Sequence, residues 1–321
     1  MDNLIFSLNA TLPIFFTMLL GSFFKRVGLI DEAFSAKMNK FAFAVALPAL
    51  LFQDISAVDI RESWNGGFVL FCFIATFLSI TGVTVLSFFV VKREERGEFV
   101  QGAYRSSAAI LGMAFIQSMY SSTGMAPLMI VAAVPLFNIF SVIVLTFKAV
   151  PENSDGKAAE KDSASNIKKA CINIARNPII IGIVLGFLAS VAGLKQPVIM
   201  QKTIQSVAQT ATPVALICIG AGFEGSKAIK KIKPTLIATF IKLVGIAAIA
   251  IPVAVMMGFR NQELVAILIM TASPSTVTCY IMAKNMDNDG VLSSSIIVLT
   301  TLLSSITLTG WIFVLRSLGL I

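Results

Sequence analysis

Long apolar runs alternate with short polar segments along almost the whole chain. Several of these runs exceed the roughly 20 residues that an α-helix needs to cross a bilayer. The pattern predicts an all-α integral membrane protein with ten transmembrane helices, numbered in chain order and lying at about 4–24, 38–55, 65–91, 99–120, 126–149, 177–194, 203–223, 234–258, 263–283 and 291–315.

The composition supports this prediction. Of the 321 residues, 56% are hydrophobic and only 13% are charged, and the mean hydropathy is +0.87. A soluble fold of this length could not bury so much apolar surface, so the expected surroundings are the lipid bilayer. Histidine is absent and the four cysteines lack metal-ligand spacing, so neither a cofactor nor a metal site is expected.

Lysine and arginine are concentrated in every second loop. Nineteen of the 25 lie in the loops that follow the odd-numbered helices, and five lie on the other side. Loops rich in lysine and arginine stay in the cytoplasm, so both termini are predicted outside, in a multi-pass protein of the bacterial cytoplasmic (inner) membrane. The net charge of +8 is then a topology signal, and no nucleic-acid partner is expected.

The two halves of the chain repeat each other. Residues 13–51 align without a gap with residues 178–216, and ten of the 39 positions are identical. Each half has five predicted helices, an odd number, so the halves must insert with opposite orientations, as is typical of secondary transporters. The predicted organisation is a first repeat at 1–150, a polar cytoplasmic linker at 151–170 and a second, inverted repeat at 171–321.

Helix 9 carries the most unusual polar stretch. Its centre contains Ser273, Pro274, Ser275 and Thr276 within a longer hydroxyl-rich segment. Proline removes a backbone hydrogen bond, so we expect a break at mid-membrane. The amides that begin the second half-helix carry a partial positive charge and could bind an anion. The four residues are therefore candidate substrate-binding residues. The alternative is a hydroxyl-lined kink that binds nothing.

Helix 4 is the repeat partner of helix 9 and should also break. An offset of 160 residues places Ala114 opposite Pro274, so helix 4 has no proline at this point, and a softer break is expected near Gly112. Ser106, Ser107 and Gly112 are candidate substrate-binding residues of this helix. Ala114 is a candidate hinge.

Helices 2 and 7 each carry a proline at a matched mid-span position, Pro48 and Pro213. Proline inside a helix bends its axis, so both are candidate hinges. A packing kink without a functional role is the alternative, because membrane helices tolerate proline well. These two helices also offer a face for a homodimer.

Few other polar side chains lie inside the predicted spans. Gln117 in helix 4 and Asn138 in helix 5 are candidate substrate-binding residues, although hydrogen bonding between helices explains them equally well. Lys242 in helix 8 is a candidate cation that pairs with the substrate or gates it, unless its long stem reaches the membrane surface. Arg105 either attracts anions at the cytoplasmic mouth or is a topology signal.

Acidic residues are absent from the interior of the ten runs; Asp54, Glu224 and Glu263 lie at their ends. Cation antiporters and sodium symporters usually bind their ions on buried carboxylates. A small organic anion, moved by secondary transport, is therefore the favoured substrate. A cation or proton antiporter and a membrane receptor that binds without transport stay open as alternatives. An enzyme lacks support, because the spans contain no histidine, acid or metal-ligand cluster.

Several motifs together carry a family resemblance. Arg105-Ser106-Ser107, with Gly112 and Ala114, follows the register R-G-N-x-x-F-x-G-x-P, with the asparagine and proline replaced. With ALP in helix 2, TP in helix 7 and the helix 9 proline, the chain resembles a bacterial member of the auxin efflux carrier family. The resemblance implies crossed, broken helices 4 and 9, a scaffold of helices 1, 2, 6 and 7, and a transport domain of helices 3–5 and 8–10. Elevator-like alternating access would carry a carboxylate across the membrane.

Overall fold

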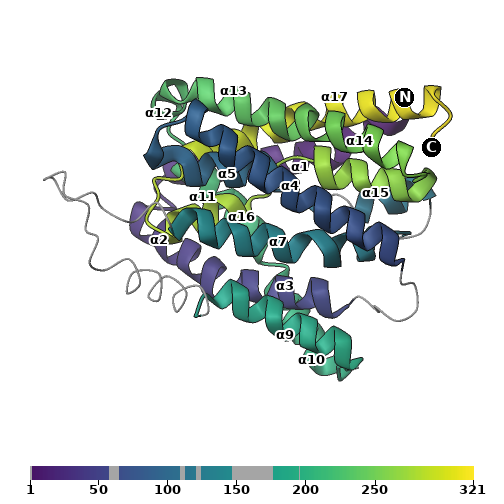
Figure 1. The fold of residues 1–321 in the computed structure, drawn as a ribbon. Helices are drawn as coiled ribbons and strands as arrows, with labels where there is room; N and C mark the ends of the chain where they lie inside the picture. The colour runs from purple at the N-terminus through teal and green to yellow at the C-terminus, as the bar shows by residue number, and fades with distance from the viewer. Residues whose placement is uncertain (1, 58–64, 109–112, 121–123, 147–175, 195) are drawn as a thin grey trace, which may run out of the picture.

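The computed structural model describes the chain in six stretches: residues 2–57, 65–108, 113–120, 124–146, 176–194 and 196–321 (Figure 1). The predicted linker at 151–170 and Gly112 lie outside these residues. Within them the chain forms helices, no strand and one isolated antiparallel bridge. The prediction of an all-α protein is therefore confirmed.

The helices follow the predicted apolar runs, and several runs are made of more than one helix. Among the described residues, six helical segments are long and apolar enough to cross a membrane. The elements are α1 (Asp2–Arg26), α2 (Glu32–Phe41), the π-helix η1 (Ala42–Ala46), α3 (Leu47–Ser56), α4 (Gly66–Val90), the 3₁₀ turn η2 (Arg93–Glu95), α5 (Arg96–Tyr104), α6 (Met113–Tyr120), α7 (Ala126–Thr146), α9 (Pro178–Ala192), α10 (Val198–Ala208), α11 (Ala211–Gly222), α12 (Gly225–Lys230), α13 (Ile232–Phe240), the π-helix η5 (Ile241–Gly245), α14 (Ile246–Met256), α15 (Asn261–Ala272), α16 (Thr278–Asn285) and α17 (Val291–Ser317).

Local sequence signals explain where several helices begin and end. The side chain of Asn65 accepts a hydrogen bond from the amide of Phe68 and caps α4. Asn177 does the same for α9, where Pro178 occupies the first turn and needs no amide partner. Gly193 ends α9 in a left-handed conformation that side chains disfavour.

Side chains are sorted as a bilayer requires. Large apolar residues such as Phe89 (83% exposed) and Met256 (86%) face outward, whereas Ser293, Thr300 and Ser304 of α17 are buried. Hydrocarbon surrounds an apolar exterior at no cost, and buried hydroxyl groups can bond to backbone carbonyls. The hydroxyl-rich helices therefore form the interior of the protein.

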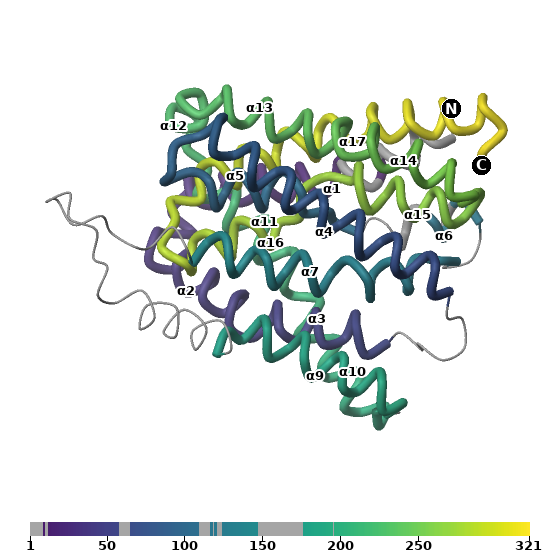
Figure 2. The backbone as a smooth tube through the Cα atoms, viewed as in Figure 1, coloured from purple at the N-terminus to yellow at the C-terminus, as the bar shows by residue number. Residues whose placement is uncertain are grey.

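Glycines bring two pairs of helices into backbone contact. A Cβ atom on Gly220 of α11 would collide with the carbonyl oxygen of Met18 in α1. A Cβ atom on Gly182 of α9 would lie 2.6 Å from the carbonyl oxygen of Pro48 in α3. Figure 2 shows α3, α9 and α10 side by side along one edge of the molecule. Because membrane helices associate through close packing, these contacts join α1 to α11 and α3 to α9.

A distortion precedes each of the two prolines predicted as hinges. Pro48 has no amide hydrogen to bond to Ala44, and the helix takes π-helical form over Ala42–Ala46. Pro213 follows an interruption between α10, which ends at Ala208, and α11, which begins at Ala211. The structure thus departs from regular α-helix beside both prolines.

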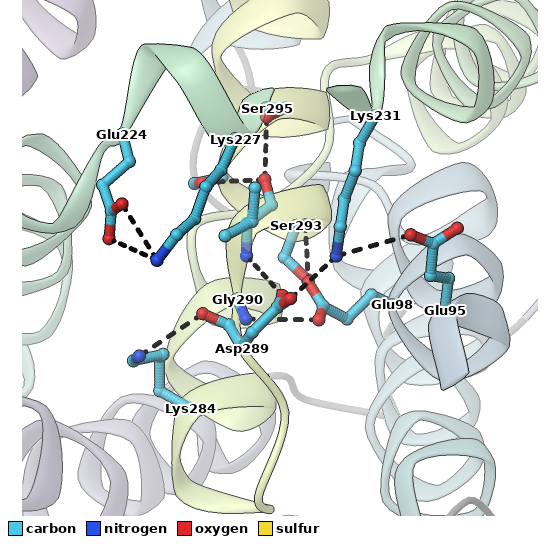
Figure 3. A network of polar contacts seen from close by, with 12 residues as sticks. Glu95, Glu98, Glu224, Lys227, Lys231, Lys284, Asp289, Gly290, Ser293 and Ser295 are labelled. Carbon is cyan, nitrogen blue, oxygen red and sulfur yellow. Dashed lines mark hydrogen bonds and ion pairs between the residues drawn. The ribbon is translucent and has the colours of Figure 1, made fainter. Parts of the chain in front are cut away.

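One end of the molecule has a polar network where α5 and α17 begin (Figure 3). Glu98 of α5 is 1% exposed, and its carboxylate accepts hydrogen bonds from the amides of Gly290 (3.2 Å) and Ser293 (2.8 Å). The N-cap residue of α17 is Gly290, which has no side chain that could accept such a bond. Glu98 therefore caps α17 from another helix.

Lys231 and Asp289 form an ion pair beside this cap, with 2.8 Å between Nζ and Oδ2. Burial alone would raise the pKa of the Asp289 carboxyl, but hydrogen bonds from Lys231 and from the Val291 amide hold that pKa below its usual value. A lowered pKa contributes stability above the ordinary pKa of the group, and this contribution is lost as the pH falls through the folded-state value. The pair therefore supports the network at neutral pH.

Replacing Gly220 with alanine is expected to destabilise the protein by about 1–3 kcal/mol, because the added methyl group meets backbone that cannot rotate away. The measurement is the melting temperature of the purified protein in detergent. Gly82→Ala is the matched control, since nothing lies within 4 Å of a Cβ atom at this position of α4. Equal melting temperatures for the two variants would contradict the packing of α1 on α11.

Glu98→Ala is expected to lower the melting temperature clearly, because two buried amides of α17 lose their acceptor at a cost of about 1–3 kcal/mol. Glu224→Ala is the control, since its ion pair with Lys227 is exposed and such pairs contribute about 1 kcal/mol or less. If the control destabilises as much as Glu98→Ala, the capping role is wrong.

Candidate functional site

The apolar run 263–283 forms two helices, α15 and α16, separated by residues 273–277. The amide of Ser273 still bonds to the carbonyl of Ile269, after which the backbone becomes extended and Pro274 follows. Proline cannot donate the next hydrogen bond, so the helix stops where the sequence predicts. The interruption leaves carbonyl groups at the end of α15 without partners in their own helix.

The fourth apolar run is also interrupted. The helix α5 ends at Tyr104, and Arg105 is extended, with φ −77° and ψ 124°. The soft break expected near Gly112 falls outside the described residues. Neither glycine nor proline is present here. The cause is tertiary, because the backbone that follows Arg105 bonds to the interrupted segment of the other half of the chain.

The two interruptions pair with each other. Ser106 and Ser275 form an antiparallel bridge, and the amide of Ser107 donates to the carbonyl of Pro274 at 2.9 Å. The hydroxyl of Ser106 donates to the carbonyl of Met270. The amide of Ser275 donates to the hydroxyl of Thr300, at 3.1 Å. Backbone groups freed by the breaks thus obtain protein partners, which the membrane interior requires.

Lys242 supports the same segment from η5. Its side chain is fully buried, and Nζ donates to the hydroxyl of Ser106 (2.5 Å) and to the carbonyl of Thr271 (2.8 Å). A cation here faces the negative end of the α15 dipole. The stem does not reach the membrane surface, and Lys242 lies behind Ser106 instead of lining the cavity described next.

Arg105 lies in the interior and not at the mouth of the protein. It is 3% exposed, and its guanidinium donates to Oδ1 of Asn138 (2.5 Å) and to the hydroxyl of Ser141 (3.3 Å), both on α7. The sulfur of Met282 lies 2.8 Å from the same group. These contacts are neutral, and no described acidic side chain forms an ion pair with Arg105. Among the described residues, the guanidinium therefore has no directly bonded counter-ion.

Arg105 lines a cavity of about 40 Å³, which is room for a few water molecules. Its wall contains five residues predicted from the sequence and three further polar residues. The predicted residues are Arg105, Ser106, Ser107, Asn138 and Thr276, and the further polar ones are Asp54, Thr212 and Thr278. The sequence contains a signal that could have identified Thr212 and Thr278, because each lies in a proline-containing polar segment inside an apolar run.

Other predicted residues lie elsewhere. Ser273, Pro274 and Ser275 form the interruption without lining the cavity. Gln117 of α6 is exposed. Gly112 lies outside the described residues, and Ala114 is in α6.

Arg105 brings a full positive charge to the cavity wall. The amides of Cys279 and Tyr280, in the first turn of α16, already bond to the carbonyls of Thr276 and Val277. The hydroxyls of Thr276 and Thr278 lie 3.0 Å apart at the cavity wall. Within the described part of the chain, no three metal-ligating side chains come together. A guanidinium surrounded by hydroxyl and amide groups suits an anion.

Comparisons with known proteins agree with a transport role. The family model described as "Membrane transport protein" matches residues 6–312. A protein of Rhizobium meliloti (strain 1021) named "Putative malonate transporter" is 25% identical over 316 residues, which cover 95% of each chain. The resemblance to auxin efflux carriers is confirmed by the family match. The chain belongs to the Membrane transport protein family and is a membrane transporter, not an enzyme.

Proposed function

We propose that the protein is a secondary transporter that moves a small organic anion, a carboxylate, through the cavity beside the two interrupted helices. The observation that carries the proposal is the buried guanidinium of Arg105, whose contacts are all neutral. A buried cation without a directly bonded counter-ion is costly in a membrane interior. A bound carboxylate supplies the missing charge and accepts the donors of Arg105 in bidentate geometry.

Lys242 strengthens this electrostatic argument. It adds a second buried positive charge behind Ser106, again with neutral partners only. Two cations next to one small cavity disfavour the binding of a cation there. The relative from Rhizobium meliloti is named for malonate, a small carboxylate, which agrees with this substrate class.

The proposed architecture is ten transmembrane helices in two inverted repeats, 1–150 and 171–321, joined by the linker at 151–170. Close helix contacts support it. Gly21 meets the backbone of Ile217, and Gly186 meets the backbone of Phe52. The sequence offset of 165 residues converts Gly21 into Gly186 and Phe52 into Ile217, so one contact is the repeat of the other.

The proposed mechanism is elevator-like alternating access. Helices 1, 2, 6 and 7 (α1, α2 with α3, α9, and α10 with α11) form the scaffold, and the rest form the transport domain. The cavity supports this division, because α3 and α11 line one side and the interrupted helices with α7 line the other. We further propose the bacterial inner membrane as the location, both termini outside, and a homodimer through the scaffold helices.

Asn138→Asp is expected to keep the fold but weaken anion binding by about 10- to 100-fold, because the new carboxylate neutralises Arg105. The measurement is binding of malonate to the purified protein, with the melting temperature as a check on folding. Asn177→Asp is the matched control: aspartate caps α9 as well as asparagine does, and this position is remote from the cavity lining. Tight malonate binding by Asn138→Asp would refute the role of Arg105.

Thr276→Leu is expected to reduce exchange of labelled malonate across liposomes by about tenfold or more, because the larger apolar side chain fills the small cavity and removes a hydroxyl. Thr81→Leu on the lipid-exposed face of α4 is the control and should exchange normally. Saturable exchange by the unmodified protein also distinguishes a transporter from a receptor that only binds. Normal exchange by Thr276→Leu would place the substrate elsewhere.

A further inference from the structure

The cavity contains one acidic side chain among its described lining residues. Asp54 lies on α3, nearly two turns after Pro48, and it lines the same cavity as Arg105. None of the described residues donates a hydrogen bond to its carboxyl group or forms an ion pair with it. A largely buried acid without donors is costly, and a leucine would serve packing better.

Other ionisable groups near Asp54 are few. Arg105 is the one other charged residue in the described cavity lining, and it is held on the α7 side by Asn138 and Ser141. Of the helices packed around α3, α7 and α9 have no ionisable side chain in their described residues. The ionisable residues of α10 and α11 are Lys202, which is exposed, and Cys218, which contacts the carbonyl of Ser35. Arg105 and a bound anion are therefore the charges that most strongly affect proton binding by the Asp54 carboxyl.

We propose that Asp54 couples anion binding to proton binding, so that the cavity takes up an anion together with one proton on the Asp54 carboxyl. The inference rests on the proposed function and adds the coupling ion. When the cavity is empty, the carboxylate of Asp54 balances the guanidinium of Arg105. When an anion enters, it becomes the counter-ion of Arg105, and Asp54 accepts a proton from solvent. The proton returns to solvent when the anion leaves, so one negative charge of the anion is offset by the proton on Asp54.

The physical basis is the repulsion of two negative charges in one small, poorly hydrated cavity. A bound anion makes Asp54 hold a proton more tightly. By reciprocity, a proton on Asp54 makes the cavity bind the anion more tightly by the same factor. The protonated carboxyl can also donate a hydrogen bond to the anion, which the carboxylate cannot do. Anion affinity must therefore rise as the pH falls.

The test is calorimetric titration of the purified protein with malonate between about pH 6.5 and pH 8.5, in buffers of different ionisation enthalpy, which report the protons taken up. For the unmodified protein, we expect the dissociation constant to increase with pH by about threefold to tenfold per unit, with uptake of up to one proton, the limit for a single linked group. Asp54→Asn should bind at all these pH values as tightly as the unmodified protein does at the acid end, without proton uptake.

Two further variants control this experiment. Asp54→Glu keeps the acid and should keep the pH dependence. Glu263→Gln removes a half-buried acid that contacts Asn65 away from the cavity, and should behave as the unmodified protein. Melting temperatures confirm that each variant is folded.

The outcomes separate this inference from the proposed function. Malonate binding without proton uptake, or equal proton uptake by Asp54→Asn, would overturn the role of Asp54 and leave the anion site standing. Absence of malonate binding and exchange in the unmodified protein and in every variant would overturn the proposed function, and the role of Asp54 with it.

Discussion

The site depends on one constraint: in the membrane interior, water is not available to bond to backbone groups released by a broken helix. The chain meets this constraint by bringing two breaks together. Ser107 donates to the carbonyl of Pro274, and Ser106 is bridged to Ser275. Lys242 supplies a donor to the carbonyl of Thr271. Each break is therefore stable because the other is present, although they lie about 170 residues apart in sequence.

The same pairing determines where the charge is. Because the backbone leaves the helix at Arg105, the guanidinium extends between α7 and α16, where Asn138, Ser141 and Met282 hold it. From the sequence alone, Arg105 near the start of the fourth apolar run could be a topology signal. The interruption thus converts a topology signal into an interior cation, and the anion selectivity that we propose follows from this change.

The sequence predicted those features that depend on local chemistry or on the solvent. Apolar runs predicted the helices, because hydrocarbon selects for them, and Pro274 predicted its own break, because proline cannot donate a hydrogen bond. The end of α5 could not be predicted in this way. Tyr104-Arg105-Ser106 contains no helix breaker, and its partner is a distant segment. The sequence places Asp54 at the end of an apolar run. Its position in the cavity lining depends on the packing of α3, which the sequence does not show.

The packing also bears on how so small a cavity could serve the transport that we propose. On one side, α3 and α9 are joined by the contact of Gly182 with Pro48, and α1 and α11 by the contact of Gly220 with Met18, so backbone meets backbone. On the cavity side, α3 presents apolar side chains such as Leu47 and Leu51 to the cavity that residues of the interrupted segments also line. Contacts between apolar side chains can slide with less cost than interlocked backbones, which cannot separate without losing close packing. We infer that the relative movement occurs at this boundary. Asp54 and Arg105 lie on its opposite sides. The movement therefore changes the distance between the two charges, and the occupancy of the cavity changes their interaction.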